Sequence, residues 1–180
     1  QSVLVIGAGN SACDIAVESA RLAGKVCLSM RSPQWFVPKF MLGKPSDVTG
    51  AGLNFLPRRV KQWLMTLMLR ITQGSYENYG LPVNQKPVLS HHPTMNSDLL
   101  DFIRHGRITP VPGVRRIDGD CVEFTDGSRR RFDRICACTG FWIKFPFFAP
   151  ELIDFQHAEK VPLYRKMIPL VVAAGYRVIA

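Results

Sequence analysis

The chain has 180 residues, of which 47% are hydrophobic and 21% charged, and its mean hydropathy is +0.04. This composition is enough for the core of one ordinary domain and excludes a wholly disordered chain, and no apolar run approaches the roughly 20 residues of a membrane-spanning helix. The net charge of +9 favours anionic partners, but the positive residues are scattered, so we expect nucleotide phosphates and not nucleic acid.

The first 32 residues predict a strand, a glycine turn, a helix and a second strand. Apolar runs cover residues 3–6 and 26–30. The helix between them ends at Gly24 and has one face of mostly small residues at helical spacing, which would pack closely on a sheet. That face consists of Ala12, Ile15, Ala16, Ser19 and Ala20. This order is half of a dinucleotide-binding unit.

The hexamer between the first strand and the helix fits the pattern G-x-G-x-x-G/A. Gly7 allows the tight turn, Gly9 lets a pyrophosphate approach the backbone, and Ala12 keeps the helix close to the strand. Asn10 and Ser11 open the helix, whose free amides and positive dipole end attract phosphates. We predict a pyrophosphate site here; the alternative is a turn with only a structural role.

Arg31 and Ser32 end the second strand, where an NAD site carries a carboxylate for the ribose hydroxyls. An arginine fork suits phosphate oxygens instead. The sequence therefore predicts NADP(H) as the dinucleotide, with a solvated strand-end arginine as the alternative.

Prolines and glycines predict a loop over residues 33–57, in which Gly50-Ala51-Gly52 is a loop element and not a second nucleotide motif. An amphipathic helix is predicted over residues 58–72. Its apolar stripe consists of Val60, Trp63, Leu64, Leu67, Met68 and Ile71. We interpret this stripe as core-facing; a membrane-surface helix and a lid or partner-contacting helix are the alternatives.

Residues 73–95 are predicted as loop, followed by a helix over 97–104 with Asn96 or Ser97 as its N-cap and Gly106 as its end. Short strands are predicted over 108–110, 114–117 and 122–124, and a longer one over 132–138. Asp126-Gly127 predicts a hairpin turn before that last strand. The four histidines have no spacing that suits a metal, so no metal site is predicted.

The five cysteines are odd in number and form no Cys-x-x-Cys pair. Together with the missing signal peptide, they favour reduced thiols and a cytoplasmic protein. Gln1 stands directly before the first strand where a complete chain would begin with Met, so we expect a fragment of a longer protein.

Several segments together resemble the flavin-containing monooxygenases, in the order in which that family has them. They are VLVIGAGNSACDIA at 3–16, RSPQWFVPK at 31–39, HPTMN at 92–96, GRITP at 106–110, VEFTDG at 122–127, FDRICACTGF at 132–141 and FPFF at 145–148.

The resemblance implies a fold and a set of cofactor contacts. It implies an α/β, Rossmann-like NADP-binding domain with a parallel sheet over 1–140, with a helical insertion at about 54–80 and a β-hairpin. Residues 141–180 would return towards an absent FAD domain. Gly7, Gly9, Ser11 and Ala12 would lie at the pyrophosphate, and Arg31 and Ser32 at the 2′-phosphate. Thr139 and Gly140 would lie at the crossing point towards the flavin, and Asn96 near a hinge.

The resemblance also implies a reaction for the intact parent. NADPH would reduce FAD, and a hydroperoxyflavin would oxygenate a soft nitrogen or sulfur nucleophile or a carbonyl of a small-molecule substrate. The flavin motif of the family is absent here, so the fragment alone is expected to be inactive, and no catalytic residue is predicted. The alternatives are a non-catalytic NADP(H)-binding module and a flavin-dependent pyridine-nucleotide reductase, although the latter would need a cysteine pair. Membrane contact is not expected.

Overall fold

The computed structural model describes residues 1–41, 43–90, 92–141, 163–164 and 168–169. The chain divides into two compact units, Gln1–Thr139 and Gly140–Ala180. In the second unit, β12 (Leu163–Tyr164) pairs antiparallel with β13 (Ile168–Pro169). The rest of the segment predicted to return towards a flavin domain lies outside the described residues, apart from Gly140 and Phe141.

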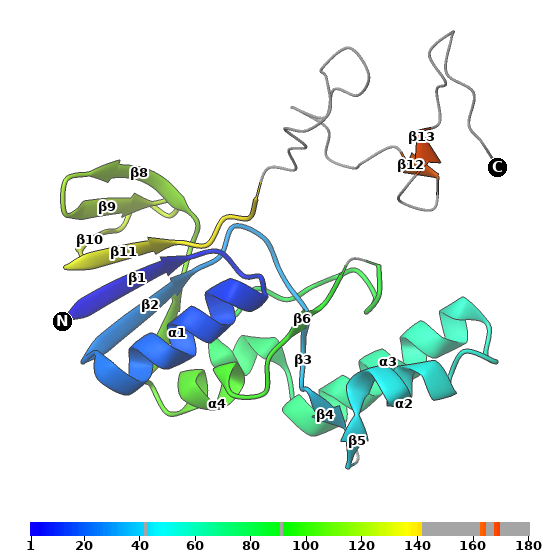
Figure 1. The fold of residues 1–180 in the computed structure, drawn as a ribbon. Helices are drawn as coiled ribbons and strands as arrows, with labels where there is room; N and C mark the ends of the chain where they lie inside the picture. The colour runs from blue at the N-terminus through cyan, green and yellow to red at the C-terminus, as the bar shows by residue number, and fades with distance from the viewer. Residues whose placement is uncertain (42, 91, 142–162, 165–167, 170–180) are drawn as a thin grey trace, which may run out of the picture. The chain divides into compact units, whose positions relative to one another are not determined.

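The first unit is built on a four-stranded parallel sheet (Figure 1). Its strands are β1 (Ser2–Ile6), β2 (Lys25–Ser29), β7 (Ile108–Val111) and β11 (Arg134–Ala137). Their order is β11-β1-β2-β7, so the chain moves outward from β1 to β7 and then returns to the other side of β1. This confirms the predicted parallel α/β fold. The point where the order reverses, beside β1, is where such sheets bind ligands.

One face of the sheet is covered by α1 (Asn10–Leu22) and α4 (Leu99–Arg104). The face that α1 buries differs from the predicted one: Cys13 and Val17 are buried, whereas Ile15 is 39% exposed. The sequence pattern is compatible with two rotations of α1 about its own axis, because apolar side chains flank the small residues on both sides.

The other face is covered by a three-stranded antiparallel sheet of β8 (Val114–Asp118), β9 (Cys121–Phe124) and β10 (Arg129–Arg131). A second core lies between the two sheets. It contains Leu4, Cys27, Val111, Val122, Phe124 and Phe132. The predicted hairpin turn is confirmed, with Gly127 at φ +82° and the Asp126 carboxylate accepting the Ser128 amide. β10 was not predicted, because three consecutive exposed arginines have no apolar alternation.

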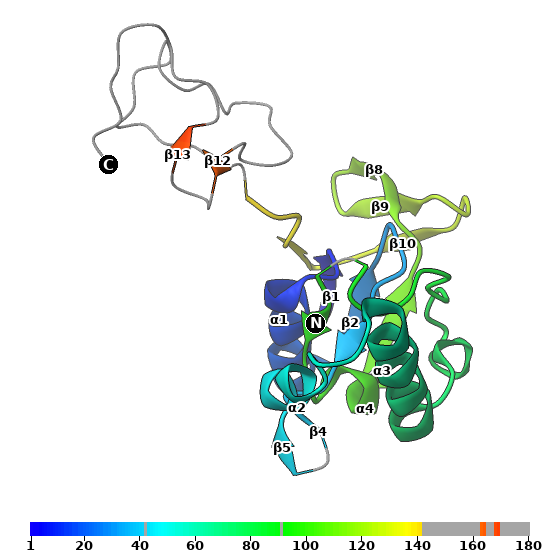
Figure 2. The same cartoon turned by 90° about the vertical axis from the view of Figure 1, so that its right-hand side faces the viewer.

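An insertion separates β2 from α4 (Figure 2). It contains β3 (Phe36–Val37), β4 (Phe40–Met41), β5 (Lys44–Pro45), α2 (Ser46–Gly52), α3 (Arg58–Gln73), the 3-10 helix η1 (Tyr76–Tyr79) and β6 (Thr94–Met95). The predicted loop over 33–57 is therefore partly wrong, and Gly50-Ala51-Gly52 forms the end of α2. Polar side chains tie that helix down locally, since Ser46 donates to the Pro38 carbonyl and Thr49 to the Pro45 carbonyl.

The amphipathic helix α3 is confirmed, but the interpretation of its apolar stripe as core-facing is wrong. Met65 and Leu69 are buried, whereas Trp63 is 64% and Ile71 75% exposed. At 100° per residue, the exposed apolar side chains lie on the side of the helix opposite the buried pair. Those side chains are Val60, Trp63, Leu67 and Ile71. Periodicity identified the stripe but not its direction, because the aromatic side chains against which Met65 and Leu69 pack come from outside the helix.

Among the described residues, there is no helix whose length and hydropathy would let it cross a membrane.

Candidate dinucleotide-binding site

The glycine turn begins where β1 ends, between β2 and β11. Gly7 has φ +132°, and its amide donates to the Ser29 carbonyl at 2.9 Å. A Cβ on Gly7 would lie 2.3 Å from the Cys138 carbonyl oxygen. No side chain fits there, so the fold itself requires this glycine.

Gly9 differs from Gly7 in its backbone angle and in the space around it. It is the N-cap of α1 with φ −79°, an angle that any residue adopts, and it is exposed. A Cβ built on it would meet nothing within 4 Å. The described chain therefore offers no reason for glycine at this position, whereas a pyrophosphate approaching the backbone does. The open space above Gly9 is compatible with a dinucleotide pyrophosphate.

The next three predicted residues have different surroundings. Ala12 is buried, and the Cβ that Gly7 lacks would lie 3.4 Å from the Ala12 Cβ, which confirms that close packing of α1 needs both small residues. Ser11 is exposed in the first turn of α1. The Asn10 side-chain oxygen accepts the Met95 amide at 2.8 Å, so only the amide group of that side chain is left for a ligand.

The thiol of Cys13 lies directly beneath this turn. Burial raises the pKa of Cys13 to about 12, and the neighbouring Asp14 carboxylate adds to the shift. Cys13 therefore stays protonated at physiological pH and acts as a small apolar group. All five cysteines are free thiols.

Arg31 and Ser32 follow β2 and are both exposed. Because Ile6 of β1 pairs with Ser29 of β2, the glycine turn and Arg31 lie at the same edge of the sheet. Within the part of the chain that the structure describes, no hydrogen bond or ion pair engages the Arg31 guanidinium. This leaves its full donor fork available.

A cavity of about 440 Å³ adjoins Arg31. Its walls come from the ends of β2 and β7, from the segment after η1 and from Thr125. Gly113 makes this arrangement possible, since a Cβ there would lie 3.4 Å from the Arg31 Cα. Arg31 therefore lies beside a concave surface large enough for part of a nucleotide.

Thr139 and Gly140 follow β11, the strand on the other side of β1. Thr139 is the last residue of the first unit and Gly140, at φ +100°, is the first of the second. Ala137 pairs with Ile6, so Thr139 leaves the sheet at the same edge as the glycine turn. The structure thus brings Thr139 to the edge that holds the turn and Arg31, while a role for Thr139 or Gly140 in binding stays a prediction.

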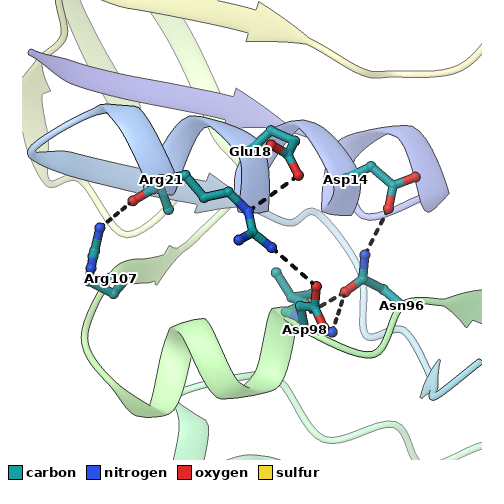
Figure 3. Close-up of polar contacts among 8 residues, drawn as sticks. Asp14, Glu18, Arg21, Asn96, Asp98 and Arg107 are labelled. Atoms are coloured by element: carbon teal, nitrogen blue, oxygen red, sulfur yellow. Dashed lines mark hydrogen bonds and ion pairs between the residues drawn. The ribbon is translucent and has the colours of Figure 1, made fainter.

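Asn96, predicted near a hinge, is a buried junction between α1 and α4 (Figure 3). Its amide donates to Asp14 at 2.9 Å, and its oxygen accepts the amides of Asp98 and Leu99 at 3.0 and 2.7 Å. The N-cap of α4 is Asp98, so neither predicted residue occupies that position, although the Asn96 side chain accepts the two amides at the start of the helix. Arg21 of α1 adds an ion pair to Asp98.

One residue of this site was missed. The Thr94 hydroxyl donates to the Ala8 carbonyl, within the glycine turn, at 2.7 Å. Thr94 belongs to the motif HPTMN, which the sequence comparison used only as a mark of resemblance. Thr94 and Ala8 are 86 positions apart along the chain. No local spacing of residues could predict a contact between them.

The chemistry of this edge is that of an anion site. It offers an exposed helix N-terminus, a free guanidinium and a concave wall, while no group of three or more acidic, histidine or cysteine side chains among the described residues is suited to a metal ion. The arrangement can hold a phosphorylated ligand. The residues that line it include no pair of groups suited to acid–base or nucleophilic catalysis.

Comparison with known proteins identifies a family for this arrangement. A model of the family described as flavin-binding monooxygenase-like matches residues 1–178. The N-oxide-forming dimethylaniline monooxygenase 2 of Rattus norvegicus is 34% identical over 175 residues, which cover 93% of this chain and 32% of the rat protein. Flavin-containing monooxygenase 3 of Homo sapiens is 33% identical over 176 residues, with the same two shares. The chain thus spans about a third of the length of these curated relatives.

A solved structure shares the fold. OTEMO in complex with FAD and NADP superposes with a TM-score of 0.60 at 12% sequence identity, covering 78% of this chain and 39% of that one.

Proposed function

This chain belongs to the flavin-binding monooxygenase-like family, and from that premise we propose that it forms the NADP(H)-binding part of a flavin-dependent monooxygenase. The observation that carries the proposal is the contrast between two glycines. Gly7 is required by the fold, whereas Gly9 faces open space at the N-terminus of α1, where a bound pyrophosphate would account for a glycine.

We assign the parts of NADP(H) to residues as follows. The pyrophosphate lies over Gly9 and the first turn of α1, where Ser11 and the side-chain amide of Asn10 face solvent. Arg31 and Ser32 bind the 2′-phosphate, and the free guanidinium fork supports this assignment. Thr139 and Gly140 remain proposed cofactor contacts, at the point where the chain crosses towards the flavin domain. When bound, NADPH supplies the electrons that reduce the flavin.

The flavin requires a second strand–glycine turn–helix unit. Gly50-Ala51-Gly52 offers none, because it ends α2 after a two-residue strand of a hairpin. We therefore place FAD mostly outside this chain, and we expect the chain alone to be colourless and inactive. The name of the rat relative favours a soft nitrogen nucleophile as the substrate of the parent enzyme, with sulfur nucleophiles and carbonyls as the wider class.

The five free cysteines support the cytoplasm as the compartment. A small-molecule substrate is the partner that we propose, and nucleic acid is not one.

Arg31→Ala tests the choice of cofactor in the intact protein. Loss of a charge-assisted phosphate contact costs about 1.5–3 kcal/mol, so we expect NADPH to bind more than tenfold more weakly and NADH nearly unchanged. The matched control is Arg116→Ala, an exposed arginine on β8, which should change neither affinity. Equal weakening of both cofactors by calorimetric titration would contradict the assignment.

Gly9→Val tests the pyrophosphate site. A Cβ there meets no protein atom within 4 Å, and the branched side chain would occupy the proposed space of the phosphates, so nucleotide binding should vanish while thermal unfolding remains cooperative. Gly50→Val is the control, because a Cβ at Gly50 also meets nothing within 4 Å. Binding that survives in the Gly9 variant would place the phosphates elsewhere.

A further inference from the structure

Three consecutive residues of one segment are bonded to the glycine turn and to α1. Thr94 donates to the Ala8 carbonyl at 2.7 Å, the Met95 amide donates to the Asn10 side chain at 2.8 Å, and Asn96 donates to Asp14 at 2.9 Å. We call residues 94–96 the brace. Figure 3 shows the Asn96 end of it, between α1 and α4.

Backbone hydrogen bonds to β3 and the residue before it fix the position of the brace. β6 pairs with β3, the Thr94 amide donates to the Trp35 carbonyl at 2.8 Å, and the Asn96 amide donates to the Val37 carbonyl at 3.0 Å. Trp35, Phe36 and Val37 are buried in the main core. The Thr94 hydroxyl therefore contacts the turn from a rigid support, with the side chain only 2% exposed.

The bond from Thr94 has a consequence for the peptide between Ala8 and Gly9. No peptide bond of the described chain is cis. In a trans peptide, the carbonyl and the following amide point in opposite directions. Because the Ala8 carbonyl is turned inward to Thr94, the Gly9 amide points outward to the open space above the turn.

The two amides of the turn therefore differ in their hydrogen bonds. The Gly7 amide donates to the Ser29 carbonyl and is not available to a ligand. The Gly9 amide makes no hydrogen bond within the described chain, and it stands at the N-terminus of α1, where an anion would gain most from it.

We propose that Thr94 is a positioning residue for the dinucleotide: its hydroxyl fixes the orientation of the Ala8–Gly9 peptide so that the Gly9 amide is already directed at the pyrophosphate. This inference rests on the proposed binding of NADP(H). Without the hydroxyl, the Ala8 carbonyl keeps only the long, weak bond from the Cys13 thiol at 4.0 Å. The peptide is then less firmly oriented, and part of the binding free energy is spent on ordering it. Thr94 contacts no phosphate itself in this assignment.

The experiment compares two probes in the intact protein. NADP⁺ uses both the pyrophosphate site and Arg31, whereas 2′-AMP uses only the adenosine end beside Arg31. Thr94→Val removes the hydroxyl at nearly constant shape, and Thr94→Ser keeps it. We expect Thr94→Val to weaken NADP⁺ by about fivefold to tenfold, the effect of one lost hydrogen bond, and to leave 2′-AMP unchanged. Thr94→Ser should bind both probes as the wild type does.

Each outcome of the titrations decides a different point. If Thr94→Val binds NADP⁺ as tightly as the wild type, or loses both probes in equal measure, Thr94 has no positioning role and serves only the fold. The same holds if Thr94→Ser behaves like Thr94→Val. Failure of the proposed function looks different, since the wild type would then not bind NADP⁺ or would bind it independently of Arg31.

Discussion

Residue spacing predicts the glycine turn correctly but predicts the helix α3 only in part. In residues 7–12, each small residue lies where its spacing predicts, because the constraint acts between atoms a few residues apart or on the adjacent strand. In α3, the spacing correctly predicts a helix with an apolar stripe, but the stripe points away from the core. A local constraint can be inferred from local sequence, whereas the direction of a helix is decided by what packs on it.

The packing around α3 shows why the sequence does not predict which face of this helix is buried. Leu69 and Met65 meet a core that includes Trp35, Phe36 and Tyr76. Tyr76 also binds the Phe36 backbone through its hydroxyl, which ties η1 to β3. These partners lie before and after the helix in a stretch where no periodic pattern predicts an element.

The largest loss of stability is expected for Gly7→Ala. The new methyl group would lie 2.3 Å from the Cys138 carbonyl oxygen at a backbone angle that alanine avoids. We expect a loss of about 3–5 kcal/mol in the free energy of unfolding, measured by urea denaturation. Gly9→Ala is the matched control and should cost under about 1 kcal/mol. Similar losses for the two variants would mean that Gly7 and Gly9 do not differ as described.

Leu69→Ala is expected to have the next largest effect. The side chain is 1% exposed and belongs to the main core. Removing it should cost about 2–5 kcal/mol, because a cavity would remain in the main core. A loss below about 1 kcal/mol would show that α3 is not packed through this face.

Asn96→Ala should cost about 1–2 kcal/mol, because it removes both the acceptor of two amides at the start of α4 and the bond to Asp14. Ser97→Ala is the control, since the Ser97 hydroxyl only accepts the exposed Lys39 amide. If the serine variant proved the more damaging by thermal denaturation, Asn96 would not be the side chain that stabilises the start of α4.

Much of the fold could be predicted, but the site only in part. The parallel strands, α1, α4 and the hairpin turn follow from alternation, glycines and capping residues. The small strands and α2 within 33–57 could not be predicted, because hydrogen bonds such as that of Ser46 to Pro38 stabilise them without any periodic pattern. Arg31 was inferred from its place after β2, whereas Thr94 escaped notice because its partner lies in a turn distant in sequence.

The smallest effect is expected for Trp63→Ser, and it tests the comparison most directly. Tryptophan is the residue whose loss from a core costs most, about 3–5 kcal/mol. Here its side chain is 64% exposed on the side of α3 opposite Leu69, so the substitution should change the free energy of unfolding by no more than about 0.5 kcal/mol. Urea denaturation beside Leu69→Ala measures both faces of one helix in one assay. A loss for Trp63→Ser equal to that of Leu69→Ala would show that the outward stripe is covered when the chain folds. The stripe would then face a core, as the sequence pattern predicts. In that case the sequence would predict α3 as well as it predicts the glycine turn.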